Sequence, residues 1–132
     1  RPHVDTGIDA TTSLSCTLSD TDESCRFLIP FAPNGFAEGT VFRVAVRTVE
    51  PEGAWAVGPD LTLSGSPAAP VFDAPVAVAA PAPLRSLSVQ LAVLAFPEAP
   101  TSVPAEVDEL ARTGAAFAFV TPELLLEPLA GP

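Results

Sequence analysis

The stretch GTVFRVAVRTVEPEGAWAVGPDLTL, residues 39–63, decides the fold class that this sequence predicts. Residues 42–49 alternate as a half-buried strand does, with one face directed to the core and the other to water. The core face takes every second residue, namely Phe42, Val44, Val46 and Thr48. Proline and glycine interrupt the pattern at 50–53, and residues 60–64 supply a second, shorter strand. The stretch therefore predicts a β-hairpin with a slightly long connection.

This hairpin resembles the last hairpin of fibronectin type III and related immunoglobulin-like modules. In those modules an aromatic-x-aliphatic-x-aliphatic strand leads through a glycine turn into a shorter strand. The residues that carry the resemblance are 39–64. It implies an Ig-like antiparallel β-sandwich, and it concerns architecture only.

Other segments predict further strands and one helix, so the expected fold class is mainly β. Apolar alternation indicates strands at 11–18, 26–31, 87–96 and 115–121. Pro75 restricts an apolar run at 71–79 to an edge strand or an extended linker. A short helix is predicted at 103–113, because Pro104 falls in its first turn and Gly114 just past its end.

The length of 132 residues favours one domain, since it is enough to bury a core. We expect an N-terminal arm at 1–10 and a single β-sandwich domain at 11–132. A second organisation is also open: a β unit at 11–66, a linker rich in proline and alanine at 67–84, and a small α+β unit at 85–132.

The charge balance limits the classes of partner. The formal net charge is −10, and the six basic residues are all arginines scattered along the chain. Phosphate binding needs clustered basic side chains, so nucleic acid is excluded as an expected partner. An anionic membrane surface is disfavoured for the same reason. No apolar run approaches the roughly 20 residues of a membrane-spanning helix, so no membrane span is expected.

The two cysteines, Cys16 and Cys25, fall near the ends of two predicted adjacent strands. A disulfide between them would constrain the unfolded chain, and it would indicate an oxidising compartment. Two free core thiols and a metal-binding pair are the alternatives. The sequence opens on Arg1 and contains no methionine, which favours a processed N-terminus. We therefore expect a secreted or cell-surface protein.

The residues needed for catalysis are sparse. His3 is the only histidine, and it lies close to a terminus, where side chains are usually mobile. There is no Gly-x-Ser-x-Gly elbow, phosphate-binding glycine loop or set of zinc ligands. We therefore expect no catalytic residues and no enzymatic activity.

An acidic loop is the candidate metal site. Asp20, Asp22 and Glu23 alternate hard oxygen ligands in the loop between the two cysteines, and such ligands suit Ca²⁺. A solvated acidic turn is the simpler interpretation, and no other cofactor is expected. Three further aspartates could join the loop: Asp5, Asp9 and Asp60.

Three side chains of the hairpin are candidates for contact with a partner. Trp55 could stack on a sugar ring, or it could lie over the edge of the core. Arg43 and Arg47 form a basic pair on an acidic chain, so they predict an interface with an acidic neighbour, including another copy of the chain.

Together these features predict a non-catalytic, secreted or cell-surface structural or adhesive protein, for example a subunit of an extracellular filament or assembly. The arm at 1–10 and the apolar tail at 123–129 are suited to strand exchange between copies, although both ends could pack on their own domain. The alternative is a carbohydrate-binding or accessory module of a larger secreted protein, which would use Trp55 and the loop at 20–23.

Overall fold

The computed structural model shows a mainly β protein. It describes residues 3–19, 23–50, 52–53, 55–62, 71–81, 85–97 and 116–129, with the backbone alone for Glu50 and 116–120. Ten strands and no helix lie in these ranges, and the helix predicted at 103–113 falls outside them. The strands are β1 (His3–Asp5), β2 (Ser13–Leu18), β3 (Ser24–Asn34), β4 (Val41–Glu50), β5 (Ala56–Val57), β6 (Leu61–Thr62), β7 (Phe72–Ala79), β8 (Leu87–Phe96), β9 (Ala116–Val120) and β10 (Leu124–Leu129).

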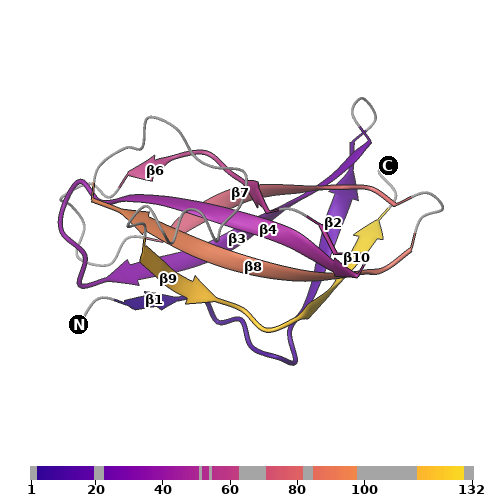
Figure 1. The fold of residues 1–132 in the computed structure, drawn as a ribbon, viewed down its shortest axis with the longest axis horizontal. Helices are drawn as coiled ribbons and strands as arrows, with labels where there is room; N and C mark the ends of the chain where they lie inside the picture. The colour runs from indigo at the N-terminus through magenta and orange to yellow at the C-terminus, as the bar shows by residue number, and fades with distance from the viewer. Residues whose placement is uncertain are drawn as a thin grey trace.

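The strands form two antiparallel sets. In the first set β3 pairs with β7 on one edge and with β2 and β1 on the other. In the second set β8 pairs with β4 on one edge and with β9 and β10 on the other, and β5 and β6 pair with β4. Parallel pairing of β10 with β2 joins the two sets into one ten-stranded sheet (Figure 1).

The predicted hairpin is present, but its second strand is interrupted. β4 pairs with β5 through Ala45 and Val57, and with β6 through Phe42 and Leu61. The returning chain therefore contacts β4 twice, with residues 58–60 between the two contacts. The strand predicted at 87–96 has the same bounds as β8.

One apolar core lies between the inward faces of the two sets. It draws buried side chains from β1, β2, β3 and β7 of the first set and from β4, β8 and β10 of the second. Four phenylalanine rings pack together in it, with centroids 5.0–6.1 Å apart: Phe31, Phe36, Phe42 and Phe72. Such edge and offset contacts add to the stabilisation from burying apolar area.

The outer face of β4 and β8 corrects the sequence prediction. The alternation assigned this face to water, yet Ala45, Ala92 and Leu94 are fully buried. A second, smaller cluster, formed by Val41, Ala45, Leu94 and Phe96, covers part of it, and Trp55 and Val57 pack against that cluster. The alternation missed this cluster because Trp55 and Val57, which pack against it, belong to the chain after the turn and not to β4 or β8.

β7 is an edge strand, as Pro75 allows. Its eight residue pairs all lie with β3, and Pro75 stands opposite Leu28. A Cβ built on Gly58 would lie 3.2 Å from the Pro75 carbonyl oxygen, so this carbonyl faces away from β3. The amide nitrogen and carbonyl of one strand residue point to the same side. The missing N–H of Pro75 is therefore on the outer edge, where no ladder hydrogen bond is lost.

Candidate functional site

The most distinctive part of the fold is the place of the C-terminal strand. β10 lies between β2 and β8, and Leu126 stands opposite Leu14 on one side and Leu87 on the other. Leu124 and Leu126 belong to the main core, whereas Leu125 and Leu129 are about half exposed. The apolar tail predicted at 123–129 is thus largely a strand that completes the core (Figure 1).

Thr121 anchors the chain just before β10. Its amide donates to the Leu91 carbonyl, and its hydroxyl accepts the Leu91 amide, each at 2.9 Å. The hydroxyl also donates to the Pro122 carbonyl, and the Thr121 carbonyl accepts the Gln90 side-chain amide. The Thr121 hydroxyl therefore takes the place of a backbone acceptor for the Leu91 amide, in the connection between β9 and β10. Thr121 is only 3% exposed.

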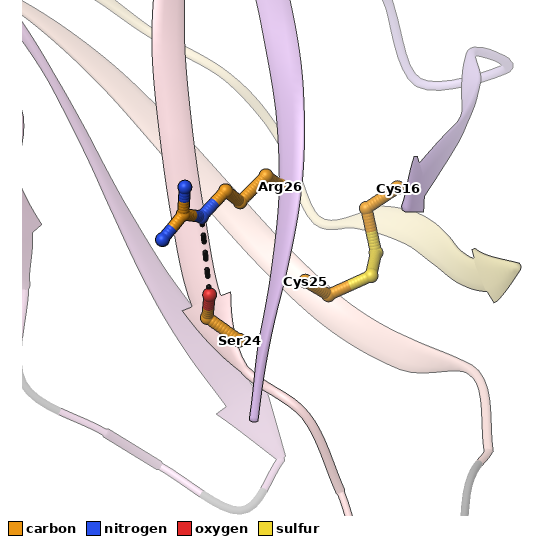
Figure 2. The surroundings of a disulfide bond; sticks show 4 residues. All are labelled: Cys16, Ser24, Cys25 and Arg26. Carbon is orange, nitrogen blue, oxygen red and sulfur yellow. Dashed lines mark hydrogen bonds between the residues drawn. A yellow bond between two sulfur atoms is a disulfide. The ribbon is translucent and has the colours of Figure 1, made fainter. Parts of the chain in front are cut away.

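A disulfide ties β2 to β3. Cys16 and Cys25 are bonded, with their Cα atoms 5.4 Å apart, and both are buried in the main core (Figure 2). β2 shares only two residue pairs with β3 and five with β10. The covalent bond thus joins strands that share little backbone pairing.

The N-terminal arm contains a strand of three residues. β1 pairs with the far end of β3, where His3 stands opposite Asn34, and Val4 is buried in the main core. Asn34 donates to the Asp5 carboxylate at 2.9 Å, and His3 lies 3.4 Å from the same carboxylate on the exposed surface. The arm therefore packs on its own chain here.

The basic pair of the hairpin lies among groups of the same chain. Arg43 forms an ion pair with Asp60, and its side chain is 20% exposed. Arg47 donates from two nitrogens to the Gln90 side-chain oxygen, at 3.0 and 2.7 Å. Neither side chain extends freely into water, so the predicted interface with an acidic neighbour would need these contacts to be shared. That role stays a prediction.

Trp55 is partly buried against the outer cluster, and Arg47 covers one face of its ring. The guanidinium carbon lies 5.0 Å from the ring centroid, a cation–π distance. A sugar that stacked on this face would have to displace Arg47. The sugar-binding role of Trp55 also stays a prediction, and the contacts favour the interpretation as a core-edge residue.

The predicted calcium loop lies mostly outside the described residues. Asp20 and Asp22 belong to the part that is not described, and Glu23 is exposed with a left-handed backbone, φ 53°. In the described ranges no three His, Cys, Asp or Glu side chains gather as metal ligands would. Asp60, named as a further ligand, pairs instead with Arg43.

Asp9, also named as a further ligand, caps a local turn. Its carboxylate accepts the Thr11 hydroxyl at 2.6 Å and the Thr11 amide at 2.8 Å. These hydrogen bonds favour the charged form of the carboxylate and lower the pKa of Asp9 below its usual value. The bond from the Thr11 hydroxyl makes the largest contribution. The Asp9 carboxylate therefore stabilises this turn.

A pocket of about 640 Å³ lies between β3 and β7 on one side and residues 56–59 on the other. Its lining is mainly apolar, and Arg26 is the one charged side chain among the described lining residues. No local pattern in the sequence predicts this pocket, because its lining comes mainly from residues 24–28, 56–59 and 75–77, which lie far apart in the chain. Gln90 and Thr121 were missed for the same reason: their bonds join distant segments.

The chain was compared with protein-family models, with curated proteins and with solved structures, and none of them matches it. The resemblance to fibronectin type III modules is therefore supported by the β-rich fold alone. The described ranges also lack any helix with the length and apolar character needed to cross a bilayer.

Proposed function

We propose that this protein is a non-catalytic β-sandwich module, secreted or at the cell surface, with a structural or adhesive role that depends on exchange of terminal strands between copies. The observation that carries the proposal is the place of β10. A strand at the end of the chain fills a slot between β2 and β8 and supplies two core leucines.

The order of the strands supports a sandwich. Immunoglobulin-like domains place strands A, B and E in one sheet and C, F and G in the other. Taking β2, β3, β4, β7, β8 and β10 as A, B, C, E, F and G reproduces both neighbour orders. The strands after residue 70 pair with strands of the first half, which favours one domain at 11–132 over two units joined by a linker at 67–84.

Strand exchange needs little change in energy once a fold of this kind exists. The slot between β2 and β8 makes the same contacts whether β10 comes from its own chain or from another copy. The connection from Thr121 to Leu124 is short, and a short hinge loop favours exchange. β1 offers a second terminal strand, held by three residue pairs.

The proposed location outside the cell is supported by the disulfide. Cytosolic reductants keep most thiols reduced, so a buried disulfide in a chain of this size favours an oxidising compartment. The absence of enzymatic activity rests on the sequence, which offers a single histidine and no nucleophile motif.

The test is a crosslink between two different chains. Ser13 and Leu125 are exposed register partners on β2 and β10, so Ser13→Cys and Leu125→Cys place two thiols side by side. The two single variants are co-expressed and treated with a short thiol crosslinker. Exchange predicts a covalent dimer that contains one chain of each kind.

The control is the double variant S13C/L125C, in which crosslinking within one chain is also possible. Light scattering over a range of concentrations measures the mass of the unmodified protein alongside it. A monomer at high concentration that yields no mixed dimer, while the double variant crosslinks within one chain, would refute strand exchange.

A further inference from the structure

The pocket beside the edge strand β7 has a defined construction. Its floor is formed by β3 and β7, and its wall by residues 56–59, which leave β4 at the interrupted return of the hairpin. Gly58 fixes that wall, because its amide donates to the Val44 carbonyl at 2.9 Å. Its missing side chain allows close approach to the Pro75 backbone, where a Cβ would lie 3.2 Å from the carbonyl oxygen. Residue 58 therefore ties this wall to β4 and brings it close to β7.

The size and lining of the pocket suit a small molecule. Its volume of about 640 Å³ falls within the roughly 300–1,000 Å³ of typical ligand pockets, which are mostly apolar with a few placed polar groups. Apolar side chains make up most of its lining, among them Leu28, Val57, Pro59, Pro75 and Ala77. Leu28 is 62% exposed, which is unusual for a leucine on a strand, and it lies on the floor of this cavity.

The polar groups of the pocket are Ser24 and Arg26, on the same face of β3 as Leu28. Arg26 donates from Nε to the Ser24 hydroxyl at 3.3 Å, which orients the guanidinium. Figure 2 shows both side chains on the side of β3 opposite to Cys25 and the disulfide. A guanidinium at the wall of an apolar cavity attracts an anion, and its planar donors match a carboxylate.

We infer that this pocket binds a small amphipathic anion, whose apolar body fills the cavity and whose carboxylate meets the Arg26 guanidinium. A cation is disfavoured because Arg26 is the one charged side chain in the described lining. The ligand class goes beyond the proposed assembly function and does not depend on it, because β10 contributes nothing to the described lining.

A peptide strand is the competing occupant, because the pocket borders the outer edge of β7. Two features oppose it. Pro75 supplies no N–H to an added strand, and residues 58–59 already approach the same edge. The geometry thus favours a compact ligand over backbone pairing.

The test measures binding of three probes with the same ten-carbon chain by isothermal titration calorimetry: decanoate, decanol and decyltrimethylammonium. All are used below the concentrations at which they aggregate. We expect saturable binding of decanoate, about tenfold weaker binding of decanol, and no binding of the cation. Equal affinity for decanoate and decanol, or no binding of decanoate, would overturn the inference. So would saturable binding of an alternating apolar peptide by a protein that does not bind decanoate.

Two variants with matched controls locate the ligand. Arg26→Gln should weaken decanoate binding about tenfold, whereas Arg85→Gln makes the same change at an exposed arginine outside the described lining and should leave it unchanged. Ala77→Phe fills the cavity from an exposed position and should abolish binding. Ser15→Phe adds the same ring on β2, away from the pocket, as its control. Normal decanoate affinity in both R26Q and A77F would refute the site.

Discussion

At the scale of the residue, Thr121 holds the bend that precedes the last strand. Its hydroxyl accepts the Leu91 amide and donates to the Pro122 carbonyl, in a site that is almost fully buried. Thr121→Val keeps the shape but leaves these groups unpaired, so it should lower the free energy of unfolding by about 1–3 kcal/mol. Thr121→Ser keeps the hydroxyl and should lower it by less than about 1 kcal/mol. Urea denaturation measures both values, and equal losses would contradict this role.

Asp9 gives a second prediction at this scale, for pH. Hydrogen bonds, of which the one from the Thr11 hydroxyl is the strongest, lower the pKa of Asp9 in the folded protein. The contribution of these bonds to stability is therefore fully present above the usual aspartate pKa. It is lost as the pH falls through the lowered value. An NMR titration should therefore give Asp9 a midpoint below that of an unstructured aspartate. Thr11→Val should raise the midpoint and Thr11→Ser should not. A usual midpoint in the unmodified protein would contradict the hydrogen bonds.

At the scale of the element, the disulfide substitutes for backbone pairing between β2 and β3. Its cysteines are nine residues apart, and closing so short a loop stabilises a fold by roughly 2–3 kcal/mol in the loop-entropy model. The double variant C16A/C25A should lose at least about that much free energy of unfolding in a denaturant titration. A reductant should destabilise the unmodified protein and leave the double variant unchanged. Similar stability with and without reductant in the unmodified protein would contradict this role of the disulfide.

Elements with clear periodicity were predictable, and elements defined by distant contacts were not. Alternation over ten residues was enough to place β8, and a proline in an apolar run was enough to identify β7 as a candidate edge strand. The tail at 123–129 carried no usable period, because apolar residues dominate it. These residues form a strand because they pair with β2 and β8, and the local sequence does not reveal that pairing.

At the scale of the whole molecule, two sets of strands share one core and are joined through their terminal strands. The sequence predicted the inward faces of β4 and β8 correctly. It missed the burial of their outer faces, because Trp55 and Val57 reach that face only after the chain turns back. The candidate pocket was missed for a related reason, since β3, β7 and residues 56–59 meet only in the folded chain. Predicted interface and metal residues depend on partners that a sequence does not show.

β10 joins the two sets by parallel pairing with β2 and antiparallel pairing with β8. The most direct measurement is a set of nuclear Overhauser contacts from Leu126 in isotope-labelled protein. We expect contacts from Leu126 to both Leu14 and Leu87, with neighbouring contacts in parallel register along β2, whether β10 comes from its own chain or from another copy. Contacts to Leu87 without any to Leu14, or an antiparallel register along β2, would contradict this pairing.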